Sequence, residues 1–144
     1  MFNFRKKSPE ASEVRKSKWF KNAKSKAKNY LDSPDKIPSL IERAKKKAKK
    51  KSGPLREVWE GLMTFFRLLK AYAKKEYREI PWESIVFILA SIIYFVMPFD
   101  LISDFLPGGF IDDASLIAWT LGSVSVDIEN FRQWEKEKGR QTDE

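Results

Sequence analysis

The chain has 144 residues, which fits one domain, and 42% of them are hydrophobic, so a buried core is expected. It contains no cysteine and no histidine, which excludes disulfide bonds, thiolate chemistry, zinc sites and histidine-based catalytic triads. The net charge of +8 is divided unevenly, because residues 1–80 have a balance of +15 and residues 81–144 a balance of −7.

The first 53 residues predict basic helices with narrow apolar faces. A weak apolar stripe at helical spacing runs through residues 19–30, and Ser33-Pro34-Asp35 then marks a break. Residues 39–51 carry a second stripe among six lysines, before Ser52-Gly53-Pro54 ends it. Such helices are marginal alone in water, so we expect this region to be partly flexible. No apolar segment follows the first residues, and no cleavable signal peptide is expected.

Residues 55–80 carry the clearest amphipathic pattern in the chain. Their apolar residues recur at helical spacing, and Pro54 and Pro81 bound the segment. Residues 84–99 follow without a single charge and are apolar on every side. Their β-branched residues would also suit a buried strand, but no second segment of comparable quality exists to pair with them. A helix is therefore favoured.

Residues 100–113 interrupt the helical pattern with Pro107, Gly108 and Gly109. A helical stripe resumes at Ala114 and continues to about Trp134. The predicted fold is all-α: a small helical protein with a hydrophobic helical hairpin (about 82–98 and 111–131), preceded by an amphipathic helix (about 55–80) and basic N-terminal helices. The expected division is a Lys-rich region (1–53), a helical domain (54–134) and a polar tail (135–144).

The hairpin can be placed in a membrane or in a protein core. From Glu79 to Phe131 there is no Lys or Arg, and cations flank this stretch on both sides. Sixteen helical residues reach about 24 Å, against a hydrocarbon core of about 30 Å, so one transmembrane helix is marginal and a hairpin with both ends cytoplasmic fits better. The helix at 55–80 would then lie along the membrane surface. The alternative is a helical bundle in which residues 84–98 form the central core helix.

The segment from Tyr94 to Asp113 carries a specific motif. Its residues are Tyr94, Pro98, Asp100, Leu101, Ile102, Asp104, Phe105, Pro107, Asp112 and Asp113. In this pattern the chain resembles the YkvA-like family, of the domain of unknown function 1232 type, over about residues 78–118. Ser103 stands where that family usually has proline, and the segment between Pro107 and Asp112 is one residue shorter than usual. The resemblance implies a helical protein, often described as membrane-associated, without an assigned activity.

Four carboxylates of this motif, Asp100, Asp104, Asp112 and Asp113, form the one acidic cluster that could carry chemistry. They could bind a hard cation such as Mg²⁺ or Ca²⁺, or form a proton or ion site in lipid. Helix capping is favoured, because aspartate beside proline and glycine commonly accepts backbone N–H bonds. No catalytic residue and no cofactor is assigned.

The run of lysines predicts an anionic partner. Its members are Lys45, Lys46, Lys47, Lys49, Lys50 and Lys51. They could bind anionic lipid headgroups or nucleic acid, or simply face solvent. Three tryptophans, Trp82, Trp119 and Trp134, could form an interfacial belt or pack in the core.

These patterns predict a membrane-associated helical protein on the cytoplasmic face, a scaffold or adaptor without catalysis. A second hypothesis is a soluble helical bundle that binds nucleic acid or an acidic partner through its basic half. A third is a cation-binding protein, or a metal-dependent enzyme, that uses the aspartate cluster.

Overall fold

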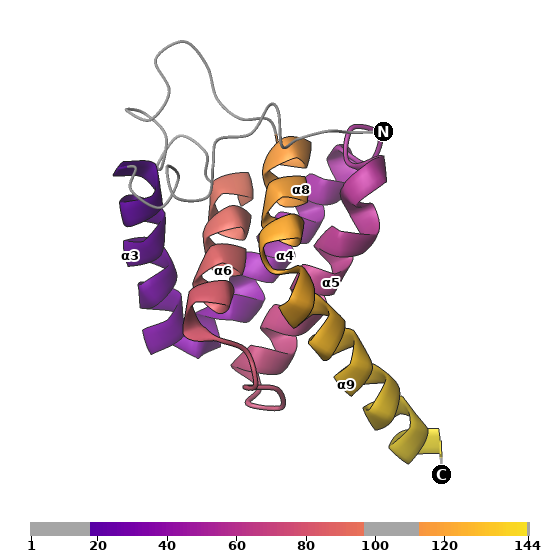
Figure 1. Ribbon diagram of the computed structural model, residues 1–144. Coiled ribbons are helices and arrows are strands. Elements are labelled where there is room, and N and C mark those ends of the chain that lie inside the picture. The colour runs from indigo at the N-terminus through magenta and orange to yellow at the C-terminus, as the bar shows by residue number, and fades with distance from the viewer. Residues whose placement is uncertain (1–17, 97–112, 144) are drawn as a thin grey trace.

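The computed structural model describes residues 18–96 and 113–143, and within these ranges it contains six α-helices and two short 3-10 turns (Figure 1). In chain order these are α3 (Lys18–Asp32), η1 (Pro34–Lys36), α4 (Ile37–Lys50), η2 (Arg56–Val58), α5 (Trp59–Ala73), α6 (Trp82–Val96), α8 (Asp113–Ser123) and α9 (Ser125–Asp143). The described ranges contain no strand, so the all-α prediction is confirmed, including the choice of helix over strand for the apolar run.

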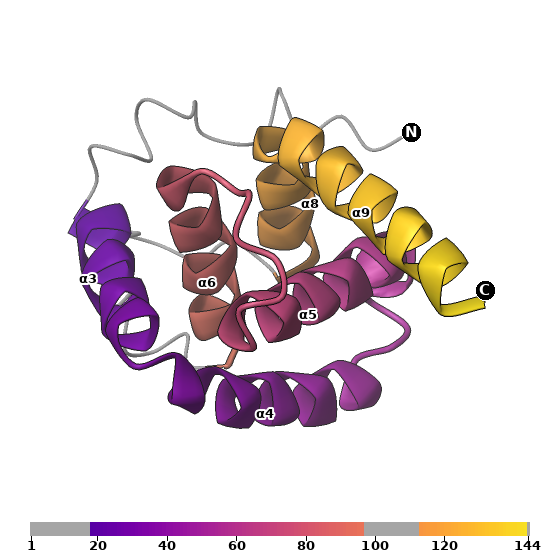
Figure 2. The same cartoon turned by 90° about the horizontal axis from the view of Figure 1, so that it is seen from below.

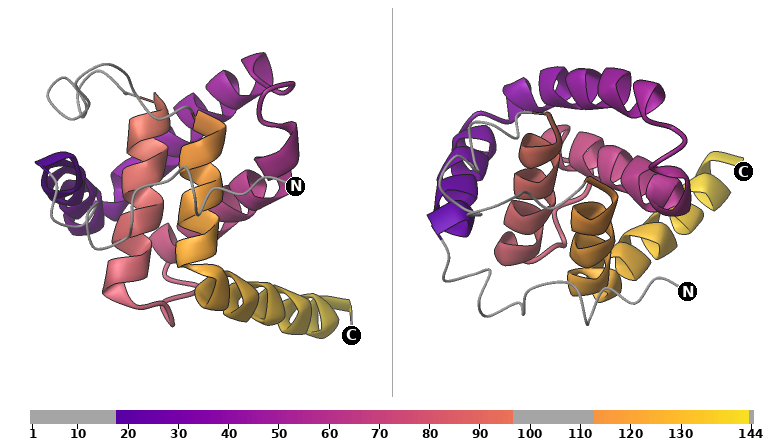
Figure 3. Two further views of the ribbon diagram at one scale, coloured as in Figure 1. Left: turned by 45° about the horizontal axis from the view of Figure 1, so that its top comes forward. Right: turned by 90° about the horizontal axis from the view of Figure 1, so that it is seen from above.

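Helix α6 lies at the centre of the described fold. Every residue from Ile85 to Phe95 is buried, and α6 packs against α3, α4, α5 and α8. Figures 2 and 3 show these four helices around it. A helix that is apolar on all sides needs partners on all sides, and here protein supplies them.

The basic helices α3 and α4 each turn one apolar stripe toward α6. In α4 the buried residues Ile37, Leu40, Ile41, Ala44 and Ala48 recur every three or four positions. They belong to the same buried cluster as residues of α5, α6 and α8, together with Ala27 of α3. The hydrophobic core therefore contains residues from both sides of residue 53, where the Lys-rich region was expected to end. The narrow apolar stripes predicted from the sequence are sufficient to dock α3 and α4.

Helix α5 ends earlier than the predicted boundary near residue 80. After Ala73 the chain closes a Schellman motif: the N–H of Glu76 donates to the carbonyl of Ala71 (2.9 Å), and the N–H of Lys75 donates to that of Tyr72 (3.1 Å). This places Lys75 in the left-handed conformation, with φ 62°. Glycine usually occupies that position, so a lysine there did not indicate the end of a helix.

The second arm of the hairpin is divided into two helices, α8 and α9, at Val124. The Thr120 hydroxyl donates to the Leu116 carbonyl, and the Ser123 hydroxyl donates to the Trp119 carbonyl. Such bonds back to the preceding turn bend helices, and Figure 3 (left) shows α9 leaving α8 in a new direction. The predicted arm at 111–131 is thus replaced by Asp113–Ser123 and a longer α9, which extends through the predicted polar tail to Asp143.

Burial explains why the residues from Ile85 to Phe95 of α6 include no cation. Within the described residues, no helix combines the length and the apolar character that a membrane span needs. The predicted transmembrane helix is therefore not found there. A cation among Ile85–Phe95 would be buried without water, which is costly.

Replacing Lys75 by glycine is expected to raise the free energy of unfolding by about 1 kcal/mol, because glycine adopts a positive φ without the clash of a Cβ atom. Urea denaturation followed by circular dichroism measures the change. Lys74 is the matched control, since its φ of −82° gives glycine no such advantage. A Lys75→Gly variant no more stable than Lys74→Gly would contradict this account.

Gly61 of α5 lies against Leu121 of α8. A Cβ atom built on Gly61 would lie 2.3 Å from Cδ1 of Leu121. Gly61→Val is expected to cost about 1–3 kcal/mol of stability through overpacking. Adding Leu121→Ala removes the clashing atoms, so a double-mutant cycle should show the two changes costing less together than their sum. Strict additivity would mean that the two positions do not touch.

Candidate functional site

The described ends of the sequence motif lie on two helices that pack against each other. Tyr94 is buried near the C-terminal end of α6, and Asp113 is the first residue of α8, which packs beside α6. Eight motif residues, from Pro98 to Asp112, lie outside the described residues, and three of the four predicted carboxylates are among them. Cation binding and helix capping by this cluster both stay predictions. In the part that is described, no group of three or more potential metal ligands occurs.

The C-terminal end of α6 is held by Lys47 of α4. The Lys47 ammonium donates to the carbonyl of Phe95 and lies 5.0 Å from the centroid of the Phe95 ring. The last carbonyls of a helix lack partners within it and form the negative end of the helix dipole, so a cation is stabilising there. Lys47 is thus half-buried and faces the bundle, unlike the other lysines of its run.

The remaining cations of α4 form one exposed surface, the α4 basic face, defined as Arg43, Lys45, Lys46, Lys49 and Lys50. They occupy the positions between the buried residues of α4, so the packing of α4 on the core turns them outward. None of the five forms an ion pair with another residue of the described ranges. Lys51, at the C-cap, is exposed beside them.

The three predicted interfacial tryptophans do not share a surface. Trp82 begins α6 and is 48% exposed, with the Lys24 ammonium 5.2 Å from its ring centroid. Trp119 is buried in the core, edge to face with Phe87. Trp134 is partly buried on α9, against the core. Packing in the core or at its boundary, one of the two predicted alternatives, is therefore observed for Trp119 and Trp134 but not for Trp82.

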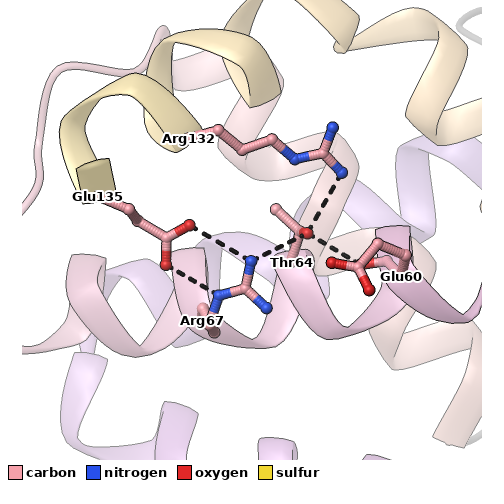
Figure 4. A network of polar contacts seen from close by, with 5 residues as sticks. All are labelled: Glu60, Thr64, Arg67, Arg132 and Glu135. Carbon is pink, nitrogen blue, oxygen red and sulfur yellow. Dashed lines mark hydrogen bonds and ion pairs between the residues drawn. The ribbon is translucent and has the colours of Figure 1, made fainter. Parts of the chain in front are cut away.

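A polar network joins α5 to α9 (Figure 4). Arg67 forms a two-pronged ion pair with Glu135, its Nε lying 2.8 Å and its Nη2 3.3 Å from the carboxylate oxygens. The hydroxyl of buried Thr64 accepts from Arg67 and Arg132, and donates to the Glu60 carbonyl. The hydrogen bond to Glu135 raises the pKa of Arg67, so the guanidinium stays charged.

Beside this network lies a groove between α5 and α9 with a volume of about 510 Å³. Its lining residues are Arg67, Lys70, Ala71, Glu76, Phe131, Trp134, Glu135, Lys138 and Gly139. The sequence predicted a helical stripe only as far as about Trp134. The partner helix of this stripe was not predictable, because the sequence pattern treated residues 135–144 as a tail.

The buried polar side chains offer little chemistry. In the described ranges these are Thr64, Ser91 and Thr120, and each donates to a backbone carbonyl of its own helix. Tyr77 is buried beside Phe131 and Trp134, and this burial raises the pKa of its phenol. The tyrosine therefore stays neutral and serves packing.

Comparisons with known proteins identify the central part of the chain. A family model described as a protein of unknown function (DUF1232) matches residues 84–119, which comprise most of α6 and the first part of α8. The uncharacterized membrane protein YkvA of Bacillus subtilis (strain 168) is 33% identical over 76 residues, covering 51% of this chain and 70% of that protein. No solved structure matches significantly.

The family match falls on the helix that the whole bundle encloses and on the motif that follows it. The resemblance seen in the motif and the identity to the curated relative agree on the same assignment. The chain therefore belongs to the YkvA-like DUF1232 family of proteins of unknown function.

Proposed function

We propose that this protein is a non-catalytic scaffold or adaptor that associates peripherally with the cytoplasmic face of a membrane. The α4 basic face is the observation that carries this proposal. Its five cations are exposed together, and the opposite face of α4 is buried in the core. Helix α4 therefore has no apolar side to insert into lipid, and its contact with the membrane is electrostatic.

The strength of such a contact follows from the number of cations. A Lys or Arg close to an anionic membrane surface contributes about 1 kcal/mol, and salt screens the attraction over about 8 Å at physiological ionic strength. Five cations on one face are enough for salt-sensitive binding. The described surface adds little apolar anchoring, since Trp82 and Val126 are its exposed large hydrophobic residues.

The relative supports an anionic membrane, rather than another polyanion, as the partner of the α4 basic face. Its name describes it as a membrane protein, and a family that acts at membranes would need a way to bind them. Cytoplasmic lipid surfaces are anionic, which matches the charge of the α4 basic face. Each buried polar side chain of the described core donates a hydrogen bond to a backbone carbonyl of its own helix. This agrees with a role in binding, which needs no reactive group in the core.

Replacing Lys45, Lys46, Lys49 and Lys50 by glutamine is expected to abolish co-sedimentation with vesicles that contain phosphatidylglycerol. The wild-type chain should sediment with these vesicles at low salt, should be released as salt increases, and should not bind phosphatidylcholine vesicles. The four substitutions are all on exposed positions, so circular dichroism should show an unchanged fold.

The matched control replaces Lys70, Lys74, Lys75 and Lys136 by glutamine, which removes the same charge from exposed positions elsewhere. This variant should retain most of its vesicle binding. Equal losses in both variants would mean that net charge, and not the α4 basic face, governs binding. A wild-type chain that ignores anionic vesicles but shifts DNA in a salt-dependent manner would replace this proposal with the nucleic-acid hypothesis.

A further inference from the structure

The exposed turn that follows α4 places a serine beside the α4 basic face. Helix α4 ends at Lys50, Lys51 is its C-cap, and Ser52 and Gly53 follow in the turn that leads to η2. Every residue from Lys51 to Pro54 is exposed, and a Cβ atom on Gly53 would meet nothing within 4 Å. Figure 2 shows this connection at the edge of the bundle. Ser52 is therefore accessible to an enzyme.

The hydroxyl of Ser52 does not hold the turn together. It forms no hydrogen bond with another described residue. Backbone bonds of its neighbours hold the turn instead: the N–H of Leu55 donates to the carbonyl of Lys51 (3.0 Å), and the N–H of Arg56 donates to that of Gly53 (3.2 Å). A group attached to the Ser52 oxygen therefore breaks no hydrogen bond of the described fold.

The position of Ser52 differs from that of the other exposed serines in the described ranges. Ser25 and Ser39 lie within α3 and α4, and Ser123 and Ser125 lie within α8 and α9. Protein kinases bind the residues around their target as an extended chain, which the interior of a helix does not provide. Ser52 lies outside the helices, and the three residues directly before it are lysines at a fraying helix end. A kinase with carboxylates in its substrate groove is complementary to these cations.

We infer that Ser52 is a phosphorylation site, and that its phosphate releases the α4 basic face from the membrane. This inference rests on the function proposed above, because it concerns the regulation of the same surface. In the reaction, the Ser52 oxygen attacks the γ-phosphorus of ATP, the bond to the β-phosphate oxygen breaks, and ADP leaves. The hydroxyl proton passes to a base of the kinase.

The charge of the phosphate is large compared with that of the surface beside it. A phosphoserine carries about −1.5 to −2 charges at pH 7, against the five cations of the α4 basic face. Lys45 precedes Ser52 by about 10 Å along the helix axis, which is comparable with the screening length of about 8 Å at physiological ionic strength. The phosphate also lies at the negative end of the α4 dipole, so the helix does not neutralise it. The attraction to anionic lipid is therefore reduced by nearly two charges.

The decisive experiment incorporates phosphoserine in place of Ser52 during synthesis of the full chain. Co-sedimentation then measures binding to vesicles made of phosphatidylglycerol and phosphatidylcholine in equal parts. The phosphorylated chain should bind at least about tenfold more weakly than the unmodified chain. Treatment with a phosphatase should restore the binding, and Ser52→Ala should bind like the unmodified chain.

The matched control carries phosphoserine in place of Ser125, the exposed first residue of α9. This modification adds the same charge at a distant position and should leave most of the vesicle binding intact. Circular dichroism should show the same helical content in both phosphorylated chains and in the unmodified one.

A kinase reaction tests whether Ser52 itself is a substrate. The full chain is incubated with ATP and the catalytic subunit of cyclic-AMP-dependent protein kinase, which selects basic residues before its target serine. Mass spectrometry should find phosphate on Ser52 and none on Ser125, and Ser52→Ala should lose this phosphopeptide.

Three results would overturn the inference: Ser52 left unmodified in the kinase reaction, vesicle binding unchanged by phosphoserine at position 52, or an equal loss with phosphoserine at position 125. The last result would mean that net charge alone governs the release. The function proposed above fails by a different result, namely an unmodified chain that does not bind the vesicles.

Discussion

Enclosure of α6 is the constraint on which the rest of the described structure depends. Eleven consecutive residues of this helix are buried, so no side of it can face water. Each of the four helices that pack around α6 covers one part of its circumference and adds apolar burial worth about 25 cal/mol for every square ångström removed from water. The surrounding helices need only one apolar face each, and α3 and α4 can therefore carry many lysines on their other positions.

The distribution of charge follows from the same arrangement. Segments at the centre of the bundle contain few Lys or Arg residues, and segments on its outside contain most of them. Lys47 is the instructive exception, because its long side chain passes from a basic helix to the carbonyl end of α6 and keeps its charge engaged there. What remains on α4 is a surface of five exposed cations, none of which forms an ion pair with another described residue.

The sequence predicted the type and approximate position of most helices, since helical periodicity and prolines are local signals. It could not decide what surrounds α6, because a helix that is apolar on all sides suits lipid and a protein core equally. The end of α5 was missed, since Lys75 adopts a conformation that glycine normally marks.

The candidate surfaces were predictable to different degrees. The exposed lysines of α4 were identified from their run in the sequence, although the inward direction of Lys47 was not. The groove was missed, because α9 continues through a polar sequence that resembles a tail, and the pairing of Arg67 with Glu135 joins residues 68 positions apart. Such contacts are set by tertiary packing, which periodicity does not report.

The position of α6 in the chain has a consequence for biosynthesis. Helices α3, α4 and α5 leave the ribosome before α6, at a time when the parts of their apolar faces that α6 covers are still open. The lysines of α3 and α4 favour hydration of these two helices during this interval. Once α6 has been synthesised, these three helices can pack against it without delay. This shortens the time during which the apolar surface of α6 is exposed to aggregation or to chaperones.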